Sequence, residues 1–236
     1  MYPKRLSGKE IMSPKEKQKS IFTKAIHSGE DRARYADSIT TPIVQSSTYF
    51  FKDSKEIESY TKNAKKRYEY GRYGNPTEIV AQQRLMVLNS ADDALVFSSG
   101  MMAITTTILA LVESGDHIVI TDDCYGRTLE FCRTYLKRFG IDCTIVPFGD
   151  YELLDSSIRE NTRFVFSESP TNPYLNVFDM VKFRHIGDKH KVITIIDSTF
   201  ATPYNQRPLD YGIDLVIHSG TKYLAGHNDI LAGALL

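Results

Sequence analysis

From Pro76 onward, short apolar runs alternate with longer amphipathic stretches, and this alternation constrains the fold more than any other feature of the sequence. The apolar runs predict strands over 95–97, 117–121, 143–146, 163–166, 192–196 and 215–218. Helices are expected over 77–89, 101–112, 128–139, 152–158 and 177–188, with Thr77 as the N-cap of the first. Strands and helices in such alternation are typical of a parallel sheet covered on both faces. The sequence therefore predicts an α/β fold.

Polar residues follow several of these strands. They are Ser99-Gly100, Tyr125, Glu168 to Asn172, Asp197, and Ser219 to Lys222. In a sheet of this kind, ligands bind beyond the carboxyl ends of the strands. Because these clusters converge on one edge, we expect a ligand site there.

Lys222 follows the last expected strand in the stretch SGTK and precedes the partly apolar YLAG. Most lysines are ordinary surface charges. A lysine nucleophile instead needs a lowered pKa and a nearby anion site for its cofactor. The neighbouring glycine and hydroxyl residues favour this second interpretation.

Asp197 ends the apolar strand VITIID. A carboxylate there is costly unless it has a cationic partner. A protonated pyridine nitrogen is one such partner, and it makes the ring an electron sink. A helix cap or a structural ion pair would explain Asp197 equally well.

Ser99, Gly100 and Met101 lie at a strand-to-helix turn. Backbone amides at a helix N-terminus bind phosphate, and glycine permits close approach. Ser219 and Thr221 could add hydroxyl donors. Neither GxGxxG nor GxxxxGK[ST] occurs, so a dinucleotide site and a P-loop have no support.

Two aromatic segments remain ambiguous when they are considered alone. Tyr125 could stack on a flat ring, or it could be one more half-buried tyrosine among the 14 in the chain. In Tyr70–Thr77 (YGRYGNPT), Arg72 could bind phosphate, or the segment could simply be a turn before a helix.

Composition excludes several classes of function. With 29 basic and 29 acidic residues, the chain has no basic excess for nucleic-acid binding. No apolar run approaches the roughly 20 residues that span a bilayer. The six histidines show no metal-binding spacing. Three cysteines without a CxxC pair and an N-terminus without an apolar region predict a reduced, cytoplasmic protein.

Taken together, the motifs resemble the Cys/Met-metabolism family of pyridoxal-phosphate enzymes. The matching stretches are YGRYGNPT (70–77), SSGM (98–101), DDCYGRT (122–128), ESPTNP (168–173), DSTFATP (197–203) and HSGTKYLAGHNDILAG (218–233). The resemblance runs from about His27 to Leu236, and within the family it is strongest to plant-type cystathionine γ-synthases. It implies pyridoxal-phosphate-dependent transferase fold type I (aspartate-aminotransferase-like), with a mostly parallel seven-stranded sheet.

The resemblance also implies a role for each matching residue. Lys222 would form the Schiff base with the cofactor and shuttle protons, and Asp197 would pair with the ring nitrogen. Tyr125 would stack on the ring and assist proton transfer, and Asn172 would bind the phenolic oxygen. The phosphate would be held by Ser99, Gly100, Met101, Ser219 and Thr221. Tyr70 and Arg72 would reach the phosphate of a neighbouring subunit, which implies a homodimer and, in the family, a dimer of dimers.

For function, the resemblance implies a γ-replacement that joins cysteine to an O-activated homoserine and gives cystathionine. A cystathionine γ- or β-lyase or a methionine γ-lyase would use the same cofactor groups. Arg127 stands where methionine γ-lyases tend to have cysteine, and Gly220, Ala225, Asn176 and Glu130 also depart from common family residues.

Two expectations concern domain organisation. Residues 1–60 are expected to form an N-terminal arm, and 61–236 the cofactor-binding large domain. The family continues into a C-terminal domain whose arginine binds the substrate carboxylate. We therefore expect a chain that lacks this domain, and a non-catalytic fragment is the alternative to an active enzyme.

Overall fold

The protein is described by a computed structural model over residues 19–30, 35–62 and 67–236. It divides into two compact units, Met1–Asp93 and Ala94–Leu236. The sequence placed the boundary at residue 60 instead. The structure groups α5 (Pro76–Asn89) with the N-terminal unit, in which its Arg84 donates to the carbonyl of Ser28 and pairs with Glu30.

The N-terminal unit is mainly helical. Its elements are α3 (Ile21–His27), η1 (Tyr35–Asp37), α4 (Ser54–Thr61), η2 (Gly71–Tyr73) and α5. Thr77 is not the N-cap that we expected for α5. The cap is Asn75, whose side chain accepts from the Thr77 amide at 2.8 Å, while the Thr77 hydroxyl accepts from the Val44 amide. The helix begins earlier because Pro76 suits the first helical position.

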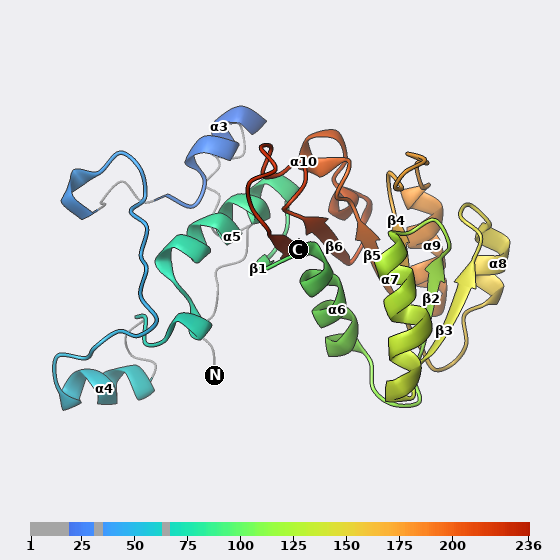
Figure 1. Cartoon of the computed structure of the whole chain (residues 1–236), viewed down its shortest axis with the longest axis horizontal. Coiled ribbons are helices and arrows are strands. Elements are labelled where there is room, and N and C mark those ends of the chain that lie inside the picture. Colours follow the sequence, from blue (N-terminus) through green and yellow to red (C-terminus); the bar gives the residue numbers. More distant parts are fainter. Residues whose placement is uncertain (1–18, 31–34, 63–66) are drawn as a thin grey trace. The chain divides into compact units, whose positions relative to one another are not determined.

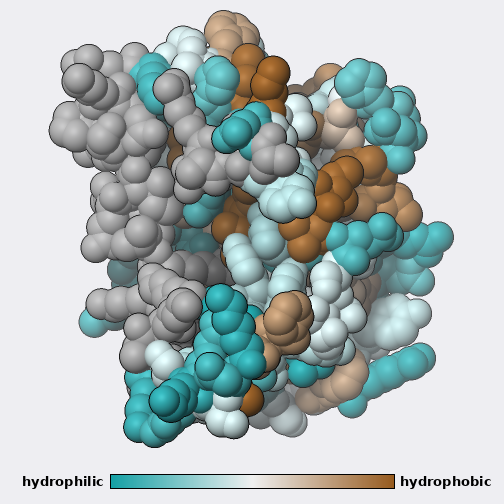
Figure 2. Space-filling model, turned by 90° about the vertical axis from the view of Figure 1, so that its left-hand side faces the viewer, coloured by the Kyte–Doolittle hydropathy of each residue, from teal (hydrophilic) through white to brown (hydrophobic). Residues whose placement is uncertain are grey.

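The surface of this unit carries large apolar side chains. Figure 2 shows hydrophobic residues in brown beside hydrophilic ones in teal on the face that it draws. The exposed residues include Phe22, Ile26, Ile39, Ile43 and Phe50. Helices α3 and α4 bury no residue.

The C-terminal unit is an α/β sheet structure (Figure 1). Its strands are β1 (Leu95–Phe97), β2 (His117–Thr121), β3 (Asp142–Val146), β4 (Thr162–Glu168), β5 (Ile193–Asp197), β6 (Leu215–Ser219) and β7 (Gly233–Leu235). Its longer helices are α6 (Gly100–Leu111) and α9 (Met180–His190), with the shorter α7 (Gly126–Glu130), η3 (Phe131–Tyr135), η4 (Leu136–Phe139), α8 (Tyr151–Ser156), α10 (Thr202–Asn205) and η5 (Pro208–Tyr211). The strand order is β1-β7-β6-β5-β4-β2-β3. The mostly parallel seven-stranded sheet implied by the family resemblance is confirmed.

Strand β7 is the strand of this sheet that periodicity did not predict. It is antiparallel to both of its neighbours, and Gly233 pairs with Phe97 of β1 and with Ser219 of β6. Its three residues are too few to show an alternation. This strand nevertheless joins β1 to the rest of the sheet.

Both faces of the sheet are covered. Phe166, Ile195 and Ile217 pack in one core with α6 and the segment from α7 to η4. Because side chains alternate along a strand, their neighbours Val165, Ile196 and Val216 point to the other face, where they are also buried. Helix α9 contacts β5 and α8 on that face.

The helices expected over 128–139 and 177–188 also differ from the observed bounds. The single helix expected over 128–139 begins at Gly126 and continues as a π turn and a 3₁₀ turn, η3 and η4. Helix α9 begins at Met180 rather than 177, because the Asp179 side chain accepts from the amides of Val181 and Lys182. Within residues 19–30, 35–62 and 67–236, no helix is long and apolar enough to cross a membrane.

Candidate functional site

Three polar side chains lie just beyond the core, at the ends of neighbouring strands and on one face of the sheet. Glu168, Asp197 and Ser219 are the last residues of β4, β5 and β6, each two positions after a residue of the α6 and α7 core. The period of two along a strand places them on that same face. Glu168 and Asp197 are register partners. The expected convergence at the carboxyl edge is therefore present for these strands.

Asp197 is a deeply buried acid of this edge, with 5% of its surface exposed. Its Oδ1 accepts from the backbone amide and the hydroxyl of Thr199, at 3.0 and 2.5 Å. Burial raises the pKa of Asp197 to about 6, although these two hydrogen bonds favour the ionised form. A cation beside this carboxyl would offset the cost of its buried charge.

Thr199 also connects Asp197 to the end of β6. Its hydroxyl accepts from the Ser219 amide at 2.8 Å while it donates to Asp197. One hydroxyl thus holds two of the predicted cofactor ligands in place. Sequence reasoning missed Thr199, and its position two residues after a strand-end aspartate was the available signal.

Glu168 is a second buried acid at this edge, 4% exposed. Its Oε2 accepts from the backbone amide of Tyr125 at 2.6 Å. Burial, and next the charge of Asp197, raise the pKa of Glu168 to about 8. The sequence placed Glu168 in a strand-end cluster but assigned it no role.

The turn before α6 forms a close-packed cradle. The Ser99 hydroxyl accepts from the Met102 amide at 3.1 Å and so caps α6, while Gly100 and Met101 are the first two residues of the helix. A Cβ on Gly100 would lie 2.6 Å from the Ser219 Cβ. The amides of a helix N-terminus attract anions. Gly100 approaches Ser219 so closely that a side chain at position 100 would force one of the two residues to move.

Gly233 supports the same turn from β7. A Cβ at Gly233 would lie 2.1 Å from the carbonyl oxygen of Ser99. Only glycine fits at this contact. The unexpected strand β7 thus presses directly on the turn that the sequence marked as an anion site.

Lys222 lies in the exposed turn after β6, where its amide donates to the Ser219 carbonyl at 3.2 Å. The neighbouring Thr221 is tied to Ala232, whose amide donates to the Thr221 hydroxyl at 3.0 Å. The turn therefore has a fixed base, and the side chain of Lys222 is accessible to a ligand.

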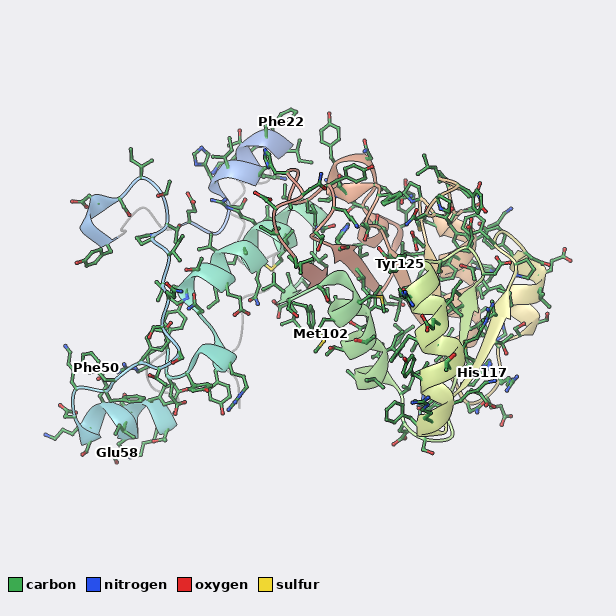
Figure 3. All side chains as sticks on the ribbon, in the orientation of Figure 1. Phe22, Phe50, Glu58, Met102, His117 and Tyr125 are labelled. Atoms are coloured by element: carbon green, nitrogen blue, oxygen red, sulfur yellow. The ribbon has the colours of Figure 1, made fainter. Side chains whose placement is uncertain are left out.

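Tyr125 is 42% exposed and directly precedes α7. Figure 3 shows it at one end of this helix, whereas His117 at the start of β2 lies at the opposite end of the sheet. Asn172 is half-buried in the loop after β4. That loop is held by Asn176, whose side chain donates to Asp123 at 2.8 Å.

Tyr70 and Arg72 belong to the N-terminal unit. The Arg72 guanidinium lies 4.9 Å from the centre of the Tyr70 ring. The two residues therefore lie together within that unit. Their predicted contact with a neighbouring subunit remains a prediction.

The residues at the edge fit a flat cationic ring that carries a phosphate. Asp197 offers a buried anion, the α6 turn offers a glycine cradle with helix amides, and Lys222 offers an accessible amine. Among the described residues, no cluster of three or more His, Cys, Asp or Glu side chains is arranged to hold a metal ion. The fold and the residues at its edge thus fit the pyridoxal-phosphate-binding class of α/β proteins.

Comparison with known proteins identifies the family. Residues 22–236 match the Cys/Met metabolism PLP-dependent enzymes, and the chain belongs to that family. The resemblance stated from the motifs and the expected cofactor, pyridoxal phosphate, are confirmed.

The similar proteins differ in named activity. Cystathionine gamma-synthase 1 (chloroplastic) of Arabidopsis thaliana is 44% identical, over 89% of this chain and 38% of its own length. Cystathionine gamma-lyase of Bacillus subtilis is 40% identical, over 91% of this chain and 54% of its own. Others are named L-methionine gamma-lyase and cystathionine beta-lyase.

A solved structure agrees closely in fold. It is that of a putative O-acetylhomoserine (thiol)-lyase from Campylobacter jejuni, with a TM-score of 0.87 and 32% identity over 92% of this chain and 54% of that one. That protein carries a pyridoxyl-lysine monophosphate. The present chain spans about half the length of this protein and of the Bacillus lyase.

Proposed function

We propose that the chain contributes the cofactor-binding half of a γ-replacement enzyme, which joins cysteine to an O-activated homoserine and gives cystathionine. The buried Asp197 at the carboxyl edge, with Lys222 in the turn after the neighbouring strand, is the observation that carries the proposal. The 44% identity to a cystathionine gamma-synthase also supports this activity.

Each residue of the site would have its own role in binding the cofactor or moving protons. Asp197 would hold a proton on the ring nitrogen, and Gly100, Met101, Ser219 and Thr221 would hold the phosphate. When bound, pyridoxal phosphate supplies an electron sink for carbanions next to the substrate amine. Lys222 would bind the cofactor aldehyde through its amine and then move protons at Cα and Cβ of the substrate.

Further contacts would complete the site. Tyr125 would stack on the ring and assist proton transfer, and Asn172 would bind the phenolic oxygen. Ser99 would act through the cap that it makes on α6. Tyr70 and Arg72 would bind the phosphate in a second copy of the chain. The active form would then be a homo-oligomer, either a dimer or a dimer of dimers.

Borohydride reduction tests the covalent cofactor. After incubation with pyridoxal phosphate and reduction, wild type should retain a covalently bound pyridoxyl group as a label. Lys222→Ala should lose this label. Lys137→Ala, an exposed lysine of η4, is the matched control and should label like wild type. An unchanged label in Lys222→Ala would refute the assignment.

Product analysis tests the reaction. Cystathionine from cysteine and O-succinyl-, O-acetyl- or O-phosphohomoserine would support γ-replacement. A 2-oxo acid released from cystathionine or methionine would favour a lyase, the activity named for the Bacillus protein. Cofactor binding without any of these products would favour a non-catalytic chain.

We also propose a cytosolic location. Cys124, Cys132 and Cys143 are all free thiols, the state that a reducing compartment maintains. The similar Arabidopsis protein is chloroplastic. Cell fractionation with an antibody against the chain distinguishes the two.

A further inference from the structure

Glu168 occupies an unusual position for an acid. It ends the buried strand β4 and lies beside Asp197 in register, and both carboxyl groups are almost completely buried. Asp123, just before Tyr125, adds a further negative charge near Glu168, and its charge also raises the pKa of that carboxyl. Glu168 cannot form an ion pair with these two acids, because all three carry the same sign of charge when ionised. Its role is therefore indicated by its hydrogen bonds.

Those hydrogen bonds go to the backbone on either side of the site. Glu168 Oε2 accepts from the Tyr125 amide at 2.6 Å, and the carboxyl also accepts from the backbone of Asn172. Both donors belong to residues that the proposed function places against the cofactor ring. The short distance to Tyr125 is typical of a strong hydrogen bond.

The backbone of Tyr125 is held from two directions. Its carbonyl accepts from the amides of Thr128 and Leu129 in the first turn of α7, at 2.8 and 3.2 Å. Its amide is held by Glu168 alone among the described residues. The side chain makes no capping bond and is 42% exposed. The hydrogen bonds of the Tyr125 backbone therefore help to set the place of its aromatic ring.

We propose that Glu168 is a positioning residue, which fixes the backbone of Tyr125 so that its ring faces the cofactor site at the end of β5. The assignment of the ring to a cofactor rests on the proposed function. The anchoring of Tyr125 by Glu168 does not, because it is a property of the chain alone.

Amide hydrogen exchange measured by NMR on the whole chain, without cofactor, tests the anchor. Glu168→Met removes the acceptor but keeps an unbranched side chain of similar length, and Glu168→Gln restores an acceptor. The Tyr125 amide should exchange slowly in wild type and in Glu168→Gln, and roughly tenfold faster or more in Glu168→Met. Amides of β2 should be unchanged in all three.

A matched control removes a different buried acid. Asp116 Oδ2 accepts from the Glu113 amide at 2.8 Å, and Asp116 precedes β2 at the opposite edge of the sheet. Asp116→Leu should leave exchange at Tyr125 unchanged. An equal acceleration at Tyr125 in this variant would attribute the effect to general loosening and overturn the proposal.

Titration with pyridoxal phosphate adds two measurements, the affinity and the absorbance band of the bound cofactor, which a merely structural role of Glu168 would leave unchanged. Glu168→Met should bind several-fold more weakly with a shifted absorbance band, and Glu168→Gln should recover both. Unchanged affinity and absorbance in a folded Glu168→Met would overturn the positioning role. Absence of binding by wild type would refute the proposed function, while the exchange rates would still decide the anchor.

If Glu168→Met does not fold, wild type and Glu168→Gln decide the matter. Slow exchange at Tyr125 in both supports the anchor. Exchange at the unprotected rate in folded wild type overturns it.

Discussion

Thr199 donates both its backbone amide and its hydroxyl to the same carboxylate oxygen of Asp197, at 3.0 and 2.5 Å. The two hydrogen bonds favour the ionised carboxyl against the opposing effect of burial. The charge that a pyridinium nitrogen requires is thus maintained by a neighbour two positions along the chain.

Removal of the Thr199 hydroxyl should weaken cofactor binding. Thr199→Val loses one bond to Asp197 and the acceptor for the Ser219 amide. We expect the pKa of Asp197 to rise further, and the affinity for pyridoxal phosphate near pH 7 to fall roughly tenfold or more. Absorbance titration measures it. Thr199→Ser keeps the hydroxyl and is the control, and equal affinity of all three proteins would contradict the expectation.

Asp197 should lower the stability of the cofactor-free chain as the pH rises. Burial raises its pKa from 3.8 to about 6, so folding favours the protonated form. The resulting stabilisation is complete below about pH 4 and is lost as the pH rises through about 6. The unfolding free energy of Asp197→Asn should therefore rise relative to that of wild type over this pH range, by roughly 1 to 3 kcal/mol.

Wild type must be compared with Asp197→Asn, because His218 changes the stability of the chain with pH in the opposite direction to Asp197. Burial lowers the pKa of His218 to about 4, so its stabilisation is lost as the pH falls. Both proteins share this effect, and it cancels in their difference. Urea unfolding at several pH values measures the difference, and a constant difference across this range would rule out a buried, protonated Asp197.

Gly233→Ala should destabilise the C-terminal unit. The new Cβ would lie 2.1 Å from the Ser99 carbonyl oxygen and 3.0 Å from the Gly100 Cα, so backbone must move. We expect a loss of roughly 1 to 3 kcal/mol, measured by chemical denaturation. Gly126→Ala meets nothing within 4 Å and should stay within about 0.5 kcal/mol of wild type. Equal stabilities of the two variants would show that β7 does not press on this turn.

Ser99→Ala tests whether this serine acts mainly as a cap. The hydroxyl accepts from the Met102 amide at 3.1 Å. Its loss should lower the unfolding free energy by about 1 kcal/mol, and Ser99→Thr should retain most of it. The same denaturation experiment measures it. Unaltered stability in Ser99→Ala would mean that the hydroxyl contributes nothing to α6.

Local sequence patterns determined the order of the first six strands, the main helices between them, and the residues at the strand ends. Apolar runs such as those of β2 and β5 differ in period from the helices between them, and this signal needs no tertiary contact. The ordered motifs around Asp197 and Lys222 likewise identified the family and its cofactor. They did not distinguish replacement from elimination, because both use the same cofactor groups.

Only the tertiary structure decided how those strand ends support one another. Gly233 lies against Ser99, Glu168 holds the amide of Tyr125, and the Thr199 hydroxyl joins Asp197 to Ser219. Each contact joins residues far apart in the sequence, or uses backbone groups that every residue carries, so no local pattern marks it. The strand order brings these partners together. Because they are buried away from water, their hydrogen bonds are electrostatically stronger than they would be at the surface.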